Sequence, residues 1–390
     1  MRTQRQSSSV IIWKRPMDIK PPPKKIKNPP TASRPPAVLP PVEMIPYQPV
    51  AAKRGWWRFW LAGAGLFLLT ATISTAIWYN WALTARSDET KQVRVVVRPG
   101  DAAAEIAQTL YDQELIKSRL AFTVYVQLNG ARSQLQAGGY VFSPNQNVSS
   151  IVEHLVVGKT DEFNVTILPG LTLKELRKKF KENGFSDSEI TEAFEADYQH
   201  PLLASRPQGA TLEGYIYPET YRMNADQSLK ALFVRVFDEM YETLQEKKYL
   251  EEFAKRNLTI HQAIILASIV QKEVKNPEDQ KQVAQVFLKR LADGMQLGSD
   301  VTYMYAADQM GVEGTPALES PYNTRKYTGL PPGPISNMNP SALDAVAFPA
   351  PGEYVYFVAG DGPDEGETFF AYTFEQHEAN IAAHCRELCN

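Results

Sequence analysis

Cysteine is nearly absent from this 390-residue chain, which has only Cys385 and Cys389, both at its C-terminal end. Two cysteines cannot build the disulfide framework that small exported domains use in place of a large core. Together with His384 they offer three candidate metal ligands at a chain terminus, which is a weak pattern for a metal site. A plain helical tail is the alternative interpretation. The sequence therefore predicts neither a disulfide framework nor a metal centre.

The signatures of several large enzyme classes are missing as well. The chain has no P-loop, no dinucleotide-binding glycine motif, no HExxH and no GxSxG, and its five histidines are scattered without metal-ligand spacing. A formal net charge of -3 argues against a protein that binds nucleic acid through bulk charge. We therefore expect no cofactor and no nucleic-acid partner.

Positive charge is concentrated at the front of the chain. Residues 1–54 contain eleven Lys or Arg against two acids, Asp18 and Glu43, so the remainder is acidic by about twelve charges. The same segment is crowded with proline and cannot bury enough apolar surface to offset the entropy of ordering it. We expect residues 1–55 to form a disordered, partly polyproline II tail. Such a tail serves either as a docking site for a proline-recognition partner or as a spacer beside an anionic membrane.

An uncharged stretch follows this tail. No charged residue occurs from Phe59 to Ala85, which as a helix is long enough to cross a hydrocarbon core of ~30 Å. Five of the six tryptophans flank the stretch, as interfacial belts do, and basic residues precede it. These features predict a single transmembrane helix over residues 56–85, with the N-terminus in the cytoplasm and the rest outside the cytoplasmic membrane. A cleavable signal peptide would need a shorter apolar run nearer Met1.

The part after the membrane segment predicts an α+β fold. Residues 90–160 open with a β-branched run and a Pro-Gly turn, then alternate short helices and strands, so we expect a small α+β module there. It resembles carbohydrate-binding modules of the LysM type. Residues 161–390 form the second expected domain. It begins with a similar strand, turn and helix, with Thr172 as the helix cap.

Most of the second domain is predicted to be helical up to about residue 294. The apolar segment 259–273 predicts a central helix, and Glu273 continues its apolar face. That carboxylate either reaches water at the helix end or lies in a cleft wall with a raised pKa. Residues 295–350 are expected to be loop-rich, and loops rich in Tyr, Asn and Asp often carry binding surfaces. A buried strand and a closing helix complete the chain.

The remaining chemistry rests on carboxylates beside aromatic and amide side chains. This combination suits sugars, because aromatic faces stack on pyranose rings and an acid can protonate a glycosidic oxygen. Such an acid has to stay neutral near pH 7, which an apolar pocket achieves by raising its pKa. Glu213, between Leu212 and Tyr215, is the best placed glutamate. From the residues alone, a plain turn with solvated charges is the favoured interpretation.

Five motifs in a fixed order add a family resemblance. They are TLEGYIYPETY, ILASIVQKE, VAQVFLKRLADGMQLGSDVTYMYA, SPYNTRKYTGLPPGPISN and ALDAVAFPA. From about Val93 to the C-terminus the chain resembles the YceG-like family of endolytic murein transglycosylases. The resemblance implies a LysM-like module followed by an α+β YceG-like catalytic domain. This sequence departs from the usual family pattern at Pro169, Gln271 and Arg325.

The resemblance assigns a role to Glu213, which occupies the position of the family's catalytic glutamate. It implies a lytic reaction between N-acetylmuramic acid and N-acetylglucosamine, in which the sugar's own C6 hydroxyl replaces water and leaves a 1,6-anhydro end. One glutamate then suffices, whereas a hydrolase normally uses two carboxyl groups. Glu273 is the expected supporting acid or a structural helix-end residue. Glu219 is expected to cap a helix entered at Thr220.

Further side chains are candidates for binding the glycan. Tyr217 and Tyr221 are expected either to stack on sugars or to belong to the core. The loop candidates, which as loop-capping residues need no such function, are Asp300, Tyr322, Asn323 and Thr324.

The expected partners are peptidoglycan glycan strands, the cytoplasmic membrane and, as further candidates, penicillin-binding wall synthases. Cutting nascent strands within the chain would terminate their elongation. Two other functions remain open at this point. One is a non-catalytic wall-binding scaffold for synthases. The other is a muramidase hydrolase with Glu273 or Glu219 as its second carboxylate.

Overall fold

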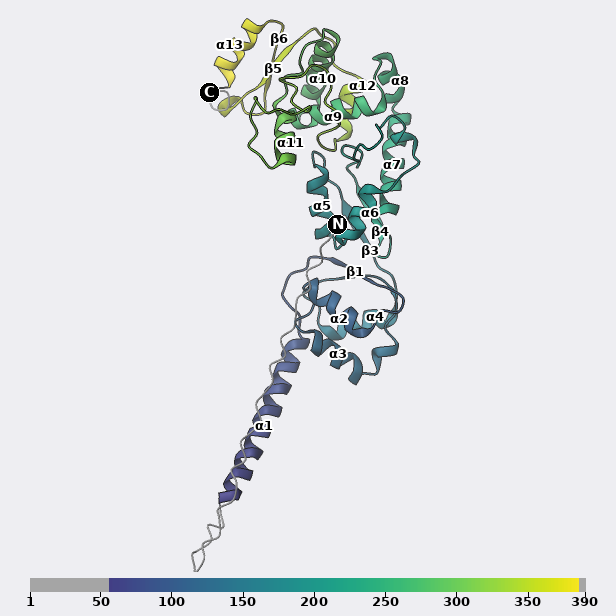
Figure 1. Cartoon of the computed structure of the whole chain (residues 1–390), viewed down its shortest axis with the longest axis vertical. Helices are drawn as coiled ribbons and strands as arrows, with labels where there is room; N and C mark the ends of the chain where they lie inside the picture. Colours follow the sequence, from purple (N-terminus) through teal and green to yellow (C-terminus); the bar gives the residue numbers. More distant parts are fainter. Residues whose placement is uncertain (1–55, 386–390) are drawn as a thin grey trace, which may run out of the picture. The chain divides into compact units, whose positions relative to one another are not determined.

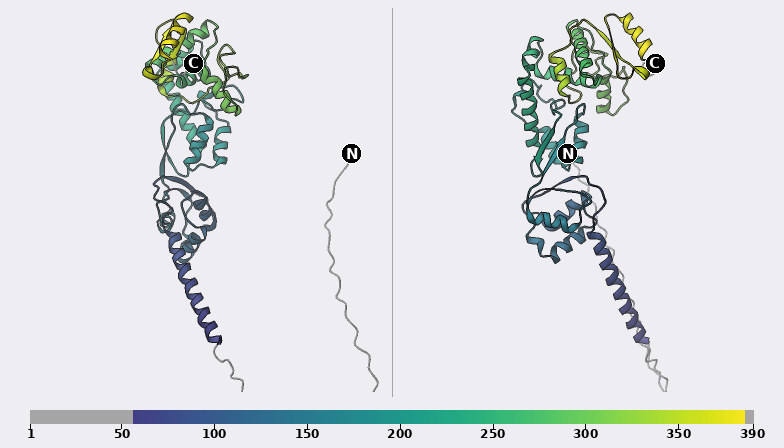
Figure 2. Two further views of the ribbon diagram at one scale, coloured as in Figure 1. Left: turned by 90° about the vertical axis from the view of Figure 1, so that its left-hand side faces the viewer. Right: turned by 180° about the vertical axis from the view of Figure 1, so that it is seen from behind.

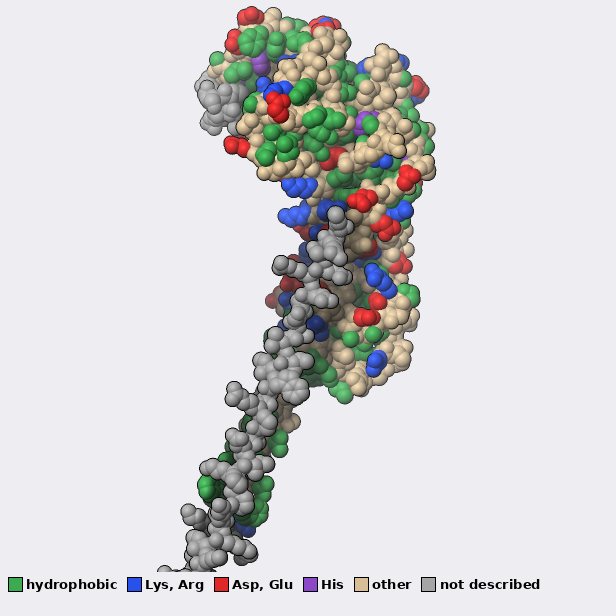
Figure 3. Space-filling model, viewed as in Figure 1, with side chains coloured by type: hydrophobic (Ala, Val, Ile, Leu, Met, Phe, Trp, Pro, Cys, Tyr) green, Lys and Arg blue, Asp and Glu red, His purple; other side chains and the backbone are tan. Residues whose placement is uncertain are grey.

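The computed structural model describes residues 56–385. The proline-rich tail predicted over residues 1–55 and the second cysteine, Cys389, lie outside the described residues. The first described element is the helix α1, Trp56–Leu83, which is long and apolar enough to span a membrane, with a mean hydropathy of 1.6. Most of its large hydrophobic side chains are exposed. The part of α1 that is not covered by grey atoms in Figure 3 is largely green, the colour of hydrophobic side chains. This helix agrees with the predicted membrane segment by length and composition.

A small α+β unit with its own hydrophobic core follows α1. Its two strands pair antiparallel, with Val95 opposite Tyr140, and both of these side chains are buried. The side chains of three helices complete the core, which includes Ile106, Phe122 and Leu155. The elements are β1 (Val93–Val97), α2 (Ala103–Asp112), α3 (Arg119–Leu128), β2 (Gly138–Phe142) and α4 (Val148–Val157). The small α+β module expected over residues 90–160 has these elements.

A second and larger hydrophobic core begins at Phe163 and extends to Ala347. Its first part is built on an antiparallel strand pair, β3 (Glu162–Thr166) and β4 (Thr220–Asn224), in which Val165 lies opposite Tyr221. Helix α5 (Leu173–Glu182) begins at Thr172, whose hydroxyl accepts a hydrogen bond from the Glu175 backbone N–H, so the predicted cap is confirmed. The other helices of this part are α6 (Asp187–Glu195), α7 (Leu229–Glu246) and α8 (Tyr249–Lys255).

Helix α9 (Ile260–Glu273) is central to the larger core, as its apolar sequence predicts. Its residues 263–270 are all buried, and Thr259 caps its first turn. It contacts α10 (Pro277–Ala292), α11 (Asp300–Met310) and α12 (Pro340–Ala347), and the views in Figures 1 and 2 show the three around it. The C-terminal hairpin of β5 (Tyr356–Ala359) and β6 (Thr368–Ala371) packs against α13 (Phe374–His384).

Two local predictions are wrong. Thr220 begins strand β4 rather than a helix, because Tyr221 and Met223 alternate with exposed residues and face the core. Glu219 therefore caps no helix and accepts a hydrogen bond from the Thr220 backbone N–H instead. The segment 295–350 is loop-rich as expected, although it also contains the helices α11 and α12. Mixed helices and small sheets agree with the predicted α+β class.

Candidate active site

Glu213 is buried where the loop before β4 meets the beginning of α5. Its side chain is 4% exposed. The carboxylate accepts the backbone N–H of Leu173, with distances of 3.0 and 3.2 Å to its two oxygens. Because Leu173 is the first residue of α5, the carboxylate lies at the positive end of a helix dipole. A second donor, the Tyr305 hydroxyl on α11, lies 3.1 Å from Oε2.

The protonation of Glu213 is set by opposing effects. Burial, the largest of them, raises the pKa of its carboxyl to about 7, and the nearby charge of Glu175 adds to this rise. The hydrogen bonds from Leu173 and Tyr305 favour the ionised form and lower the pKa. The result is a carboxyl group that exchanges its proton near neutral pH. A group of this kind can act as a general acid in one step and as a base in the next.

Tyr305, the side-chain partner of Glu213, and the neighbouring Glu175 line a cleft of about 490 Å³, which we call the acid cleft. Helix α11 contributes a stripe of residues to it, and α5 and the end of α9 contribute basic side chains. The cleft is lined by Thr172, Lys174, Glu175, Lys178, Lys272, Val301, Met304, Tyr305, Asp308 and Ile335. Its wall is thus largely apolar, with lysines at several positions, and Lys174 pairs with Asp308 at 2.7 Å.

The geometry next to Glu213 depends on a glycine and an asparagine. Gly214 has a φ of +83°, and a Cβ there would lie 2.5 Å from Pro334 and 2.9 Å from Ile264. Only glycine suits this combination of backbone conformation and space. Asn337 is fully buried; its amide donates to the carbonyls of Leu168 and Ile216 and accepts the Leu171 N–H. It therefore ties the entry of α5 to the loop that carries Glu213.

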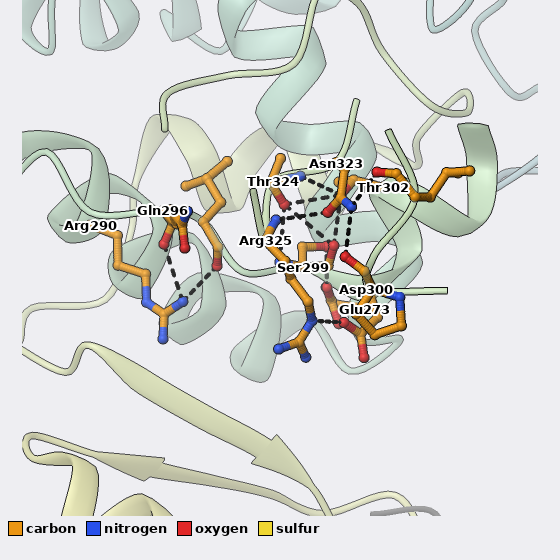
Figure 4. A network of polar contacts seen from close by, with 12 residues as sticks. Glu273, Arg290, Gln296, Ser299, Asp300, Thr302, Asn323, Thr324 and Arg325 are labelled. Atoms are coloured by element: carbon orange, nitrogen blue, oxygen red, sulfur yellow. Dashed lines mark hydrogen bonds and ion pairs between the residues drawn. The ribbon is translucent and has the colours of Figure 1, made fainter. Parts of the chain in front are cut away.

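Glu273, the last residue of α9, lies in a different polar network (Figure 4). It accepts a hydrogen bond from the hydroxyl of Ser299, the residue before α11. Burial raises the pKa of the Glu273 carboxyl to about 7. Ser299, directly before α11, and Tyr305, within it, are six positions apart, which corresponds to about 9 Å along the helix axis. Glu273 and Glu213 therefore bind to the two ends of the segment 299–305.

The tyrosines predicted to stack on sugars occupy different surroundings. Tyr217 and Tyr221 are 4% and 5% exposed and belong to the hydrophobic core, and the Tyr221 hydroxyl bonds the Tyr217 carbonyl. The core interpretation fits both. Tyr322 is only partly buried, and its ring centroid lies 5.1 Å from that of Tyr305. Burial and, to a smaller extent, the nearby charge of Glu213 raise the pKa of its phenol. Among the predicted tyrosines it has the geometry of a residue beside the acid.

The predicted polar loop residues make hydrogen bonds and an ion pair within the protein. Asn323 is fully buried and donates to the carbonyls of Pro316 and Leu318. Thr324 is 2% exposed and bonds Ser299 and Thr302, while Asp300 pairs with Arg325. Sequence reasoning missed Tyr305, although it lies within one of the family motifs. Within residues 56–385, no group of three or more His, Cys, Asp or Glu is placed to hold a metal ion.

Comparison with known proteins shows the family to which the chain belongs. Residues 95–383 match the model of the YceG-like family. The chain belongs to the YceG-like family. Among its relatives are proteins named endolytic murein transglycosylase, from Bacillus subtilis strain 168 and from Streptococcus pneumoniae serotype 2 strain D39. The first is 28% identical over 74% of this chain and 84% of its own length. The second is 30% identical over 77% of this chain and 60% of its own length.

Among solved structures, the chain is similar to a yceG-like protein from Listeria monocytogenes. The two share 28% identity, with a TM-score of 0.49, over 74% of this chain and 98% of that one.

Proposed function

We propose that this member of the YceG-like family is an endolytic murein transglycosylase and that Glu213 is its catalytic acid and base. The observation that carries the proposal is a buried glutamate with a pKa near 7, hydrogen-bonded to Tyr305 in the wall of a cleft. The names of the relatives support the same reaction. Glu213 also occupies the catalytic position implied by the family motif.

The proposed reaction needs only one carboxyl group. Protonated Glu213 donates its proton to the glycosidic oxygen between N-acetylmuramic acid and N-acetylglucosamine, and the C1–O bond breaks. The resulting carboxylate takes the proton of the muramic acid C6 hydroxyl while the bond from O6 to C1 forms. The product is a 1,6-anhydro end, no water is consumed, and Glu213 regains its proton. A pKa near the working pH suits both transfers.

The surroundings of Glu213 support each half of this cycle. Burial favours the neutral acid before the first transfer, and the donors Leu173 and Tyr305 favour the anion after it. Tyr322, beside Tyr305, is the predicted glycan contact with the most suitable position. Glu273 is proposed to act on Glu213 only indirectly, by fixing the start of α11 through Ser299. Asp300, Asn323 and Thr324 shape the loop against that helix.

A digestion assay tests the proposal against its alternatives. Purified sacculi are treated with the detergent-solubilised full chain, and the new glycan ends are identified by mass spectrometry. Anhydro ends at internal positions are expected from the unmodified protein and are lost in Glu213→Gln, while the matched variant Glu219→Gln retains them. Reducing ends would indicate a muramidase, and absence of cleavage would indicate a wall-binding scaffold.

We also propose that α1 anchors the enzyme in the cytoplasmic membrane with the catalytic part outside it. The apolar helix and the basic residues before it support this topology. A LysM-like role in glycan binding is proposed for residues 90–160, and cleavage of nascent strands beside wall synthases follows from an anchor of this kind. A reporter fused after Asn390 should be active only outside the cytoplasm. Cytoplasmic activity would refute the orientation.

A further inference from the structure

A second pocket, with a volume of about 600 Å³, lies next to the acid cleft. It is bounded by the end of α9, the start of α11, the β5–β6 hairpin and α13. Two pairs of sequence neighbours are divided between the pockets: Lys272 and Val301 line the acid cleft, and Glu273 and Asp300 line the second pocket. Consecutive residues lie only ~3.8 Å apart at their Cα atoms. The end of α9 and the start of α11 therefore form a wall between the two pockets.

Two arginines give the second pocket its character, and we call it the arginine pocket. Arg290 uses Nε and Nη1 to bond the backbone carbonyls of Val355 and Leu297, both at 2.6 Å. Among residues 56–385 it has no carboxylate within ion-pair distance, and its Nη2 makes no hydrogen bond. Burial lowers the pKa of its guanidinium, but the group stays charged at neutral pH because a guanidinium does not lose its proton in proteins.

Arg325 lines the same pocket from the loop after Asn323. Its Nε pairs with Asp300, and its terminal nitrogens make no hydrogen bond among the residues described. Figure 4 shows the guanidinium of Arg325 beside Asp300 and Glu273, with its terminal nitrogens directed away from the loop. Asp300 offsets one of the two guanidinium charges, and Glu273, with a pKa of about 7, offsets the other only in part at neutral pH. The pocket therefore keeps some positive charge and unused N–H donors.

Several other residues that line the pocket are apolar or aromatic. Tyr356 and Phe357 of β5 and Phe374 of α13 line it, and the Arg290 guanidinium lies over the Tyr356 ring at 5.2 Å from its centroid. Paired guanidinium donors match the geometry of a carboxylate, and the rings can pack against aliphatic carbon. The best matched ligand is thus a carboxylate on a short, partly apolar chain.

We propose that the arginine pocket binds a carboxylate of the peptides carried by murein glycan strands, with Arg290 and Arg325 as its donors. The proposal rests on the proposed function, because it is the murein strand in the acid cleft that would bring its peptide to the neighbouring pocket. The arginine pocket then binds the peptide substituent of the sugar while Glu213 cleaves the glycosidic bond. Strands whose peptide carboxyls are blocked would bind less well.

A binding experiment with two matched ligands tests this. The full chain carrying Glu213→Gln is titrated calorimetrically, in detergent micelles, with a murein tetrasaccharide bearing its peptides. The second ligand is the same tetrasaccharide with every peptide carboxyl converted to an amide. A hydrogen bond to a charged group makes binding of the carboxylate form at least roughly tenfold tighter, which corresponds to about 1.4 kcal/mol. Equal binding of the two ligands would overturn the proposal.

Variants at the pocket show whether Arg325 causes the preference for the carboxylate ligand. Adding Arg325→Gln should abolish most of the tenfold preference without changing the affinity for the amidated ligand, and Arg325→Lys should restore part of it. Arg222→Gln is the matched control, since Arg222 also pairs with a carboxylate, Glu162, but lines neither pocket, and it should keep the preference. If Arg325→Gln weakens both ligands equally, or neither, Arg325 does not bind the peptide and the proposal fails.

A variant that frees Arg325 from its ion pair tests the proposal in the opposite direction. Asp300→Asn removes the carboxylate that occupies Arg325, so the preference for the carboxylate ligand should increase. A decrease would contradict the proposal. Failure of the proposed reaction is detected separately, because it would show as missing anhydro ends in sacculi treated with the unmodified protein. Loss of the ligand preference with normal anhydro formation would refute the arginine pocket alone.

Discussion

The hydroxyl of Tyr305 offers a direct way to shift the protonation of Glu213. It donates a hydrogen bond to the ionised carboxylate at 3.1 Å, which lowers the pKa of Glu213 against the larger effect of burial. Tyr305→Phe removes this donor and leaves the ring. The neutral acid then becomes more favourable, so the pKa of Glu213 should rise above its value of about 7.

The size of this rise follows from the energy of the bond. A net hydrogen bond to an ionised group contributes about 1.5 kcal/mol at the low end, and one pKa unit corresponds to about 1.4 kcal/mol. We therefore expect the pKa of Glu213 to rise by about one. Because the reaction starts from the protonated acid, activity is present below the pKa and is lost as the pH rises through it. The loss should occur near pH 7 in the unmodified protein and near pH 8 in the variant.

The assay is the pH dependence of kcat/KM for anhydro-end formation on soluble glycan strands, which reports the ionisation of the free enzyme. Tyr322→Phe is the matched control, because Tyr322 lies beside Tyr305 but makes no hydrogen bond to Glu213. It should leave the midpoint of the alkaline limb unchanged, whatever it does to the rate. An unmoved midpoint in Tyr305→Phe, or a midpoint near 4.5 in the unmodified protein, would refute the reasoning.

Three further predictions concern stability. The pKa of Glu213 is about 7 in the folded protein and 4.5 in the unfolded chain, so its contribution to stability is fully present below pH 4.5 and falls by about 3 kcal/mol as the pH rises through 7. Glu213→Gln should remove this part of the pH dependence of the free energy of unfolding in urea. An unchanged pH dependence would contradict the prediction. Gly214→Ala should lower the unfolding free energy by about 1–3 kcal/mol, through both its positive φ and the contact with Pro334; a neutral effect would show that the loop can shift. Asn337→Ala should cost at least about 2 kcal/mol, because it leaves buried backbone groups unpaired; its unfolding midpoint is compared with that of Asn380→Ala, at a partly buried amide with one bond.

The sequence predicted well those elements whose signals are local. Helix α9 was predicted from its apolar segment and α5 from the cap at Thr172; in the structure Thr259 also caps α9, and Glu175 completes the cap of α5. These capping residues act within four positions of the chain, so a single sequence contains the whole interaction. The candidate acid was found for the same reason, since Glu213 stands in a contiguous motif.

Elements that depend on distant partners were missed. Helix α11 has little amphipathic pattern, and the hydroxyl of Ser299 before it bonds Glu273 instead of capping the helix. Its position is set instead by contacts with Thr324, a residue from a later loop. Strand β4 was mistaken for a helix start because Pro-Glu-Thr is typical of a first turn, whereas pairing with β3 decides its conformation. The same distance hid Tyr305, which lies 92 residues from Glu213 in the chain.

The position of Glu213 explains why the fold brings such remote segments together. Burial alone would hold the carboxyl neutral, which suits the first proton transfer but opposes the anion that must follow it. The first N–H of α5 and the hydroxyl on α11 supply the opposing stabilisation, and they come from segments 40 and 92 residues away. Both donors reach Glu213 only if the two helices are fixed in position. Asn337 fixes the start of α5, and the Ser299–Glu273 hydrogen bond fixes the start of α11. A glutamate with a pKa near 7 is therefore a property of the assembled domain, and the motif around it provides only the carboxyl group.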